Sequence, residues 1–226
     1  MSRSFDQAGF YVAFDTAGPV GSVAVSCGGD VLARVVLNER GRHAGGLVPA
    51  IGEALEEAGV DADEVSGVVV GEGPGSFTGV RVAAATAKGL VAGWNVPLWA
   101  VSSLAAGALA TLGSGVRYVL FDARGDRVYG ACYGVGVAGV ETLAPPHGGT
   151  LREVLAGDVP AGAVFMGEGA VRHWGAIEGA GFQVEGEPAG VPSGDALVRF
   201  LSLHREAPPV PDAAAWEPRY VREWSR

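Results

Sequence analysis

The segment with the clearest capacity for chemistry is a glycine-rich loop, Gly71-Glu-Gly-Pro-Gly-Ser-Phe-Thr-Gly79. It follows an apolar, valine-rich run and precedes an alanine-rich stretch, so we expect it to join a buried strand to a helix. Backbone amides at such a junction can cradle an anion, helped by the helix dipole, and the same sequence also suits a purely structural turn. The residues that could make phosphate contacts are Gly73, Gly75, Ser76, Phe77 and Thr78.

Two better-known loop types do not fit this segment. A dinucleotide fingerprint would have a third glycine where the chain has Ser76, and no Gly-Lys-Ser/Thr ending marks a Walker loop. Ser76 also lacks the spacing of a nucleophile elbow and a histidine partner, so a hydrolase triad is not predicted.

Three aspartates could supply a carboxylate. Asp15 ends the first expected strand, where a catalytic role competes with a capping or turn role. Asp122 and Asp126 flank a hairpin turn and could form an acid–base pair, but no matching nucleophile is evident. Alternating charges at a hairpin are usually solvated local pairs. We therefore assign no catalytic residue.

The sequence does not predict a metal site. His43 opens an expected helix, and a helical site would need a second ligand four residues later, where the chain has Leu47. The two cysteines stand alone in apolar, strand-like stretches and are interpreted as reduced thiols. Lys88 is the single lysine among 16 basic residues and has no distinguishing neighbours.

The composition narrows the classes of protein. A chain of 226 residues, 48% of them hydrophobic, can form a sizeable core without disulfide or metal. Charged residues make up only 18%, which excludes global disorder. A net charge of −9 argues against a surface that neutralises phosphates alone, so work on nucleic acid would need a basic partner. No apolar run reaches the ~20 residues of a membrane helix, and no signal-peptide pattern is evident, so we expect a cytoplasmic protein.

Hydrophobic patterning divides the chain into two α/β units, with a hinge at Gly113-Ser-Gly115. Strands are expected at 11–16, 22–27, 31–37, 65–70, 97–101, 116–121, 127–133, 140–143 and 163–166. Helices are expected at 43–58, 80–93, 102–112, 150–155, 169–180 and 193–204. This predicts an N-terminal lobe over residues 1–112 and a smaller C-terminal lobe over 113–226. A strand meander followed by helices and strands occurs twice, which is the layout of the two-lobed actin-like ATPase type.

Several short motifs resemble the TsaB family, also called YeaZ. They are Phe14-Asp-Thr16, His43 with Leu47-Val-Pro49, Gly73-Pro-Gly-Ser-Phe-Thr-Gly-Val-Arg81, Lys88-Gly-Leu90, Val101-Ser-Ser-Leu104, Asp122-Ala-Arg124 and Pro218-Arg-Tyr-Val-Arg222. The resemblance implies an actin-like ATPase fold with a reduced second lobe. It also implies a non-catalytic partner of the transferase TsaD, working with the ATPase TsaE. Their product is N6-threonylcarbamoyladenosine at position 37 of tRNAs that read codons beginning with A.

The resemblance further implies how the chain meets its partners. In this family the first-lobe helices form the partner interface, and the alternative is that their apolar faces only cover their own sheet. The corresponding residues are His43, Leu47, Ile51, Leu55, Arg81, Ala84 and Lys88. A homodimer is implied when the chain is alone, with tRNA contacted only through the partner. No cofactor is required, although a nucleotide could sit at the subunit interface.

Two departures from TsaD argue against an enzyme. TsaD holds its metal with a His-x-x-x-His pair, which here is His43 and Leu47, and this chain is much shorter. The alternative is a nucleotide-binding transferase of actin-like fold or an M22-like metallopeptidase, supported by the glycine loop and Asp15. A direct tRNA-binding module is opposed by the net charge of −9.

Overall fold

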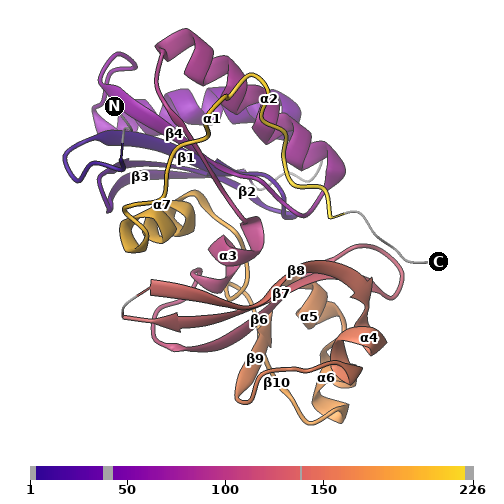
Figure 1. The fold of residues 1–226 in the computed structure, drawn as a ribbon. Coiled ribbons are helices and arrows are strands. Elements are labelled where there is room, and N and C mark those ends of the chain that lie inside the picture. The colour runs from indigo at the N-terminus through magenta and orange to yellow at the C-terminus, as the bar shows by residue number, and fades with distance from the viewer. Residues whose placement is uncertain (1–3, 38–42, 138, 222–226) are drawn as a thin grey trace.

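The computed structural model describes residues 4–37, 43–137 and 139–221, and it has two lobes, each built on a five-stranded sheet (Figure 1). The strands of the first sheet are β1 (Phe10–Asp15), β2 (Gly21–Cys27), β3 (Asp30–Leu37), β4 (Val65–Gly71) and β5 (Leu98–Val101). Those of the second are β6 (Gly115–Asp122), β7 (Arg127–Gly136), β8 (Gly139–Thr150), β9 (Ala163–Met166) and β10 (Gln183–Glu185). The predicted two-lobed α/β fold is confirmed.

The two sheets have the same topology. The first has the order β3-β2-β1-β4-β5, and the second, from its corresponding edge, has the order β8-β7-β6-β9-β10. In each, three antiparallel strands are followed by two parallel ones. This is the duplicated plan expected from the sequence, and β1 corresponds to β6 as β4 corresponds to β9.

The helices that cover the two sheets differ in length. The helices are α1 (His43–Ala58), α2 (Phe77–Trp94), α3 (Ser103–Ala108), α4 (Leu151–Ala156), α5 (Glu168–Arg172), α6 (Trp174–Gly179) and α7 (Gly194–Leu203). α1 has 16 residues and α2 has 18, whereas α4, α5 and α6 have six, five and six. The second lobe is reduced mainly in its helices.

Strand β1 is buried on both faces because helices lie on both sides of the first sheet. Successive side chains of a strand point to opposite faces. Val12 and Phe14 pack in the core under α1 and α2, while Tyr11 and Ala13 pack in a second core on the side of α7. The continuous apolar run of β1 follows from this position.

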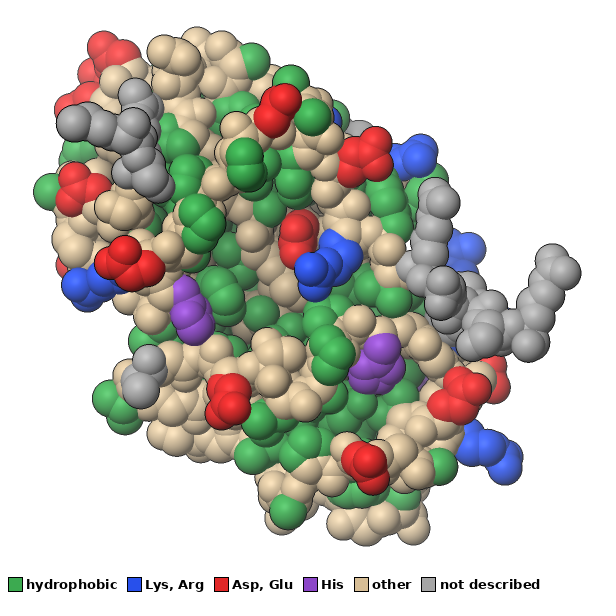
Figure 2. All heavy atoms as spheres, in the orientation of Figure 1, with side chains coloured by type: hydrophobic (Ala, Val, Ile, Leu, Met, Phe, Trp, Pro, Cys, Tyr) green, Lys and Arg blue, Asp and Glu red, His purple; other side chains and the backbone are tan. Residues whose placement is uncertain are grey.

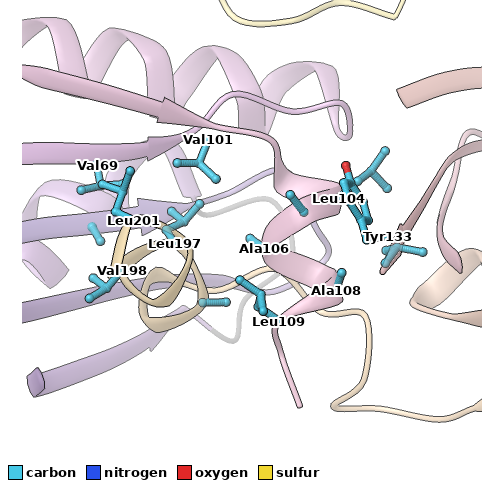
Figure 3. Close-up of a cluster of buried hydrophobic side chains, with 14 of the residues drawn as sticks. Val69, Val101, Leu104, Ala106, Ala108, Leu109, Tyr133, Leu197, Val198 and Leu201 are labelled. Atoms are coloured by element: carbon cyan, nitrogen blue, oxygen red, sulfur yellow. The ribbon is translucent and has the colours of Figure 1, made fainter. Parts of the chain in front are cut away.

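A single hydrophobic core joins the two lobes through α3. All six residues of α3 are buried. Figure 3 shows Leu104 of this helix and Leu109, the residue after it, between α7, with Leu197, and the second sheet, with Tyr133. The lobes therefore share buried apolar surface, in addition to the polypeptide segments that connect them.

Residues 194–221 depart from the predicted division of the chain, which placed everything after residue 112 in the C-terminal lobe. Helix α7 packs on β1, β2 and β4 of the first sheet. Beyond it, residues 207–221 form a C-terminal strap across the first lobe, where the Val210 amide donates to the Leu98 carbonyl at 2.7 Å. The last part of the chain thus belongs mostly to the first lobe.

Other boundaries differ locally. The predicted helix at 169–180 is two short helices, α5 and α6, that meet at His173. Helix α2 begins at Phe77, three residues before the predicted start, because the Ser76 side chain caps it. Strand β8 extends to Thr150, and β10 was not predicted from the sequence.

Candidate functional site

A cleft of about 1060 Å³ separates the two lobes beside the glycine loop. One wall is the β1–β2 turn and the start of α2, and the other is the end of β6 with α5. The wall of the first lobe is formed by Ala17, Gly18, Pro19, Gly75, Ser76, Phe77, Thr78 and Gly79. The second lobe contributes Asp122, Ala123, Arg124, Tyr129, Glu168, Val171, Arg172 and Glu187. The structure thus brings the glycine loop and the Asp122–Arg124 turn to opposite walls of one cleft.

The glycine loop is packed tightly against the end of β1. The Ser76 amide donates to the Ala17 carbonyl at 2.8 Å, and the Thr16 hydroxyl donates to the Gly79 carbonyl at 2.7 Å. A Cβ atom on Gly79 would lie 1.8 Å from the Thr16 carbonyl oxygen, and one on Gly75 would lie 2.5 Å from that of Ala17. These two glycines are required because the loop and the β1–β2 turn approach so closely.

Several polar groups of the loop already have partners inside the chain. The Gly73 amide donates to the Ser103 hydroxyl at 3.1 Å, and the Gly79 amide donates to Ser76 Oγ at 3.3 Å. Ser76 is thus the N-cap of α2. These contacts favour the structural-turn interpretation of the loop over an anion cradle.

Phe77 and Thr78 face the cleft at the first turn of α2. The Phe77 side chain is 59% exposed. The guanidinium of Arg81 lies 3.8 Å from the centre of its ring, and the Tyr220 ring lies at 6.0 Å. Phe77 is therefore an exposed aromatic at the cleft, held between a cation and the C-terminal strap.

Asp15 lies beneath the cleft and is completely buried. Its carboxylate accepts hydrogen bonds from the Ser103 hydroxyl at 2.6 Å and the Ala17 amide at 2.7 Å. Burial raises the pKa of Asp15, and these two hydrogen bonds oppose that change. The carboxylate joins the end of β1 to its following turn and to the start of α3, which agrees with the turn role in the capping-or-turn alternative weighed from the sequence.

The second wall of the cleft is organised by Asp122. Its carboxylate accepts from the Arg124 amide at 3.0 Å and pairs with Arg172 at 2.6 Å. Arg124 adopts a φ of 71°, a conformation uncommon for a residue with a side chain. Asp122 is thus engaged in local pairing, as is usual for charges at a hairpin turn, which was the interpretation favoured over an acid–base pair with Asp126.

The apolar residues assigned to the partner interface are buried inside this chain, which corrects that assignment. Leu47 is 0% exposed, Ile51 3%, Leu55 9% and Ala84 7%. Leu47, Ile51 and Leu55 belong to the core between α1 and the first sheet. The alternative weighed from the sequence, that this face covers the chain's own sheet, is therefore correct for the three α1 residues. The side chain of His43 lies outside the described part of the structure.

The two cations assigned to the same interface hold the C-terminal strap. Lys88 Nζ donates to the Ala214 carbonyl at 2.9 Å, and Arg81 Nε donates to the Tyr220 hydroxyl at 3.3 Å. These contacts tie the strap along α2. Arg81 is exposed and Lys88 is half-buried.

A different set of residues on α1 and α2 faces solvent, and we call it the small-residue face. Its members are Gly45, Val48, Pro49, Gly52, Ala85, Gly89, Ala92 and Gly93, all exposed. Val48 is 60% exposed, and Cβ atoms on Gly52 or Gly89 would meet nothing within 4 Å. This face was not predicted from the sequence, because the larger apolar residues were assigned to the interface. The available signal was the spacing of small residues three, four and seven apart on both helices.

The residues do not fit the metal of TsaD-type proteins. At the position four residues after His43, the Leu47 side chain is apolar and points into the core. Within the described residues, no group of three or more histidine, cysteine, aspartate or glutamate side chains could hold a metal ion. The β1–β2 turn at the cleft also contains no hydroxyl or basic side chain over Ala17-Gly-Pro-Val20.

Charge on the surface follows the overall composition. Over the face drawn in Figure 2, acidic side chains are scattered across both lobes and basic side chains do not gather into a continuous patch. In the part of the chain that the structure describes, no helix is both long and apolar enough to cross a membrane.

The family model described as "TsaD: tRNA N6-adenosine threonylcarbamoyltransferase" matches residues 30–165. The chain is 36% identical to the tRNA threonylcarbamoyladenosine biosynthesis protein TsaB of Escherichia coli K12 over 125 residues, 54% of each protein. It is 33% identical over 165 residues to an uncharacterized protein of Mycobacterium tuberculosis H37Rv, covering 72% of both. The match spans about half of the E. coli protein and 63% of the TsaB of Bacillus subtilis.

Solved structures agree with these relatives. YeaZ from Pseudomonas aeruginosa has a TM-score of 0.77 and 28% identity, covering 94% of this chain and 99% of that one. A P. aeruginosa protein described as similar to peptidase YeaZ has a TM-score of 0.80 and 27% identity, covering 95% and 100%. The ethanolamine utilization protein EutJ from Carboxydothermus hydrogenoformans, at 0.50 and 13% identity, shares the fold alone.

Proposed function

We propose, because this chain belongs to the TsaB/YeaZ family, that it is a non-catalytic scaffold subunit in the synthesis of N6-threonylcarbamoyladenosine at position 37 of tRNA. It binds a TsaD-type transferase and works with a TsaE-type ATPase. It contacts tRNA only through the partner and acts in the cytoplasm. In the absence of the transferase it forms a homodimer.

The observation that carries this proposal is the exposed small-residue face of α1 and α2. Neighbouring helices with small outward residues let the backbones of a second helix pair approach closely and pack over a large area. No charged residue belongs to the face, which is flanked by Glu53 and Glu56 on α1. Such a face is suited to a bundle of two helices from each subunit.

The cleft supports a scaffold more than an enzyme. Asp15, beside the loop, is buried and bonded within the chain, and Glu72 in the loop pairs with Arg219 at 3.7 Å. The loop amides of Gly73 and Ser76 are also engaged internally. Leu47 stands at the position where TsaD-type proteins have their second metal ligand. None of these groups is placed to activate a substrate.

The test pairs two exposed helix glycines, Gly89 on α2 and Gly175 on α6. A Cβ on either would meet nothing within 4 Å, so arginine at each should leave the fold intact. We expect Gly89→Arg to weaken binding to the transferase at least about tenfold, because a long charged side chain separates the helix pairs. Gly175→Arg should bind as the unaltered chain does.

The measurements are calorimetric binding to the TsaD-type transferase and threonylcarbamoyladenosine in tRNA after reconstitution with transferase and ATPase. The proposal is supported if Gly89→Arg loses both transferase binding and tRNA modification while Gly175→Arg keeps them. Equal binding by both variants would remove the α1–α2 face from the proposal. Full transfer by this chain without the transferase would establish the alternative, an enzyme.

A further inference from the structure

The chain passes from the first sheet to the second through α3 and residues 109–114, which we call the interlobe linker. Arg117 on β6 is only 6% exposed and holds this segment from the side of the second lobe. Its Nη1 donates to the carbonyls of Ala108 and Thr111, and its Nη2 donates to those of Leu112 at 2.9 Å and Gly113 at 2.8 Å. One guanidinium thus binds four carbonyl groups at the end of α3 and in the linker.

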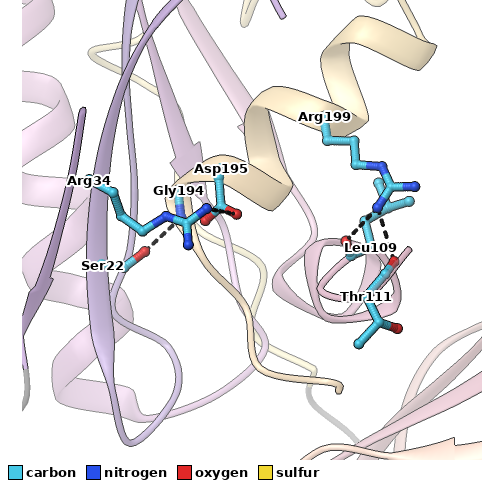
Figure 4. Close-up of polar contacts among 7 residues, drawn as sticks. All are labelled: Ser22, Arg34, Leu109, Thr111, Gly194, Asp195 and Arg199. Atoms are coloured by element: carbon cyan, nitrogen blue, oxygen red, sulfur yellow. Dashed lines mark hydrogen bonds and ion pairs between the residues drawn. The ribbon is translucent and has the colours of Figure 1, made fainter. Parts of the chain in front are cut away.

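A second arginine holds the same segment from the side of the first lobe. Arg199 on α7 donates through Nη1 to the carbonyls of Leu109 at 3.1 Å and Thr111 at 2.9 Å (Figure 4). The Thr111 carbonyl therefore accepts from both arginines. Together they bind five of the six carbonyl groups from Ala108 to Gly113.

Helix α7 is itself fixed to the first sheet at its other end. The Gly194 amide donates to the Ser22 hydroxyl at 2.7 Å, and Asp195 pairs with Arg34 on β3 (Figure 4). A Cβ on Gly194 would lie 2.6 Å from the Ala13 carbonyl oxygen, so the helix start touches the sheet backbone. α7 therefore connects the first sheet to the interlobe linker as a rigid element.

These contacts oppose bending at the linker. The last carbonyls of a helix lack partners within it, and in a flexible hinge they would exchange with water. Here guanidinium donors bind the Ala108 carbonyl at the end of α3 and four carbonyls of the linker in charge-assisted hydrogen bonds, which are stronger than neutral ones. Burial lowers the pKa of the Arg117 guanidinium; Glu185 opposes this change, and Arg199 adds to it. The side chain nevertheless keeps its charge, because arginine is not deprotonated in proteins.

From this geometry we propose that Arg117 and Arg199 form a clamp that keeps the two lobes at one angle and the cleft at one width. The shared core through α3 and α7 acts in the same direction (Figure 3). Lobe closure around a ligand would require at least some of these carbonyl contacts to break. The clamp would present the second lobe at a constant orientation to anything bound on α1 and α2.

The experiment measures the distance between the lobes in the isolated chain, so it does not depend on the proposed function. Spin labels are placed by Ser66→Cys on the first lobe and Glu178→Cys on the second, both exposed, with Cys27→Ser removing the half-buried thiol. We expect one narrow distance distribution by double electron–electron resonance, unchanged by Mg-ATP. A broad or two-peaked distribution, or a shift with Mg-ATP, would overturn the proposal.

Three substitutions then separate the clamp from general stability. Arg199→Met and Arg117→Lys should each widen the distribution at least twofold, with secondary structure retained by circular dichroism. Arg34→Met is the matched control, since it removes an arginine contact of α7 without touching the linker, and it should stay narrow. Should Arg117→Lys not fold, Arg199→Met alone decides. A narrow Arg199→Met distribution, or equal widening by Arg34→Met, contradicts the clamp.

Discussion

The ends of β1 and β6 occupy equivalent places in the two sheets, and each carries an aspartate that makes the same turn. Asp15 accepts a hydrogen bond from the amide two residues on at 2.7 Å, and Asp122 does so at 3.0 Å. Their second carboxylate oxygens differ. That of Asp15 accepts from a buried serine hydroxyl, whereas that of Asp122 pairs with Arg172 at the cleft. The first lobe buries this carboxylate completely, and the second leaves it partly exposed at the cleft.

The strand-to-helix junctions show the same duplication. After β4, a Cβ on Gly79 would collide with the Thr16 carbonyl at the end of β1. After β9, Cβ atoms on Gly167 and Gly169 would lie 2.6 Å from the Leu120 carbonyl oxygen and 2.9 Å from the Phe121 carbonyl carbon of β6. Glycine at these junctions thus follows from close packing on the central strand, in both lobes.

The largest expected effect tests the packing of the first junction. Gly79→Ala should lower the free energy of unfolding by roughly 3 kcal/mol or more, because its methyl group cannot fit 1.8 Å from a carbonyl oxygen. Gly169→Ala, at 2.9 Å, should cost less. Gly89→Ala on the open face of α2 is the control and should stabilise by up to about 1 kcal/mol. Urea denaturation gives the free energy of unfolding of all three variants. Equal values would show that the two junctions are not packed differently.

The buried Asp15 should give the first lobe a distinct pH dependence. Its pKa is raised by burial, so the folded chain binds the proton more tightly than the unfolded chain. The free energy of unfolding therefore falls as pH rises from the ordinary aspartate range through the raised pKa. Compared with Asp15→Asn, which cannot ionise, the unaltered chain should therefore lose stability as pH rises from the ordinary aspartate range through the raised pKa. A constant difference across that range would contradict this.

The cap of α4 in the second lobe should respond to pH with the opposite sign. The amide and hydroxyl of Thr150 donate to the Glu153 carboxylate, and these bonds lower the pKa of Glu153. That stabilisation is present above the ordinary glutamate range and is lost as pH falls. Thr150→Ala, which also removes the N-cap, should cost about 1 kcal/mol near neutral pH. Thermal unfolding at several pH values should show a smaller difference in stability between Thr150→Ala and the unaltered chain at acidic pH.

The smallest effect is expected at Asp122, the half-buried aspartate at the cleft. Asp122→Asn removes the charge paired with Arg172, whose side chain is 50% exposed, and should change the free energy of unfolding by less than about 1 kcal/mol. The change should shrink further in high salt. A loss comparable to that of Gly79→Ala would show that the two strand ends are not so different.

Much of the fold could be predicted because its signals are local. Apolar runs marked β1, β2 and β4, and the glycine loop marked the junction before α2. Prediction failed in two ways, over a local break in a helix and over a contact that is distant in the chain. His173 divides one expected helix into α5 and α6, and nothing in the sequence near α7 indicates that it packs on the sheet of the other lobe.

The candidate interface shows why periodicity misleads about partners. The apolar stripe Leu47, Ile51 and Leu55 marks the most hydrophobic side of α1, which a folded chain buries against its own sheet. The side left for another molecule is the small-residue face, whose composition is weakly marked. Lys88 and Arg81 were expected at a partner, yet the C-terminal strap, more than 120 residues later, uses both.

The amino-acid sequence by itself determined most of the order of strands and helices, the duplicated α/β plan, the family and the loss of a metal ligand at Leu47. These are properties of short segments and of single positions. Only the tertiary structure decided which faces remain exposed, that Asp15 is buried, and that Arg117 and Arg199 meet on one linker. Each of those depends on contacts between residues far apart in the chain, which no local pattern records.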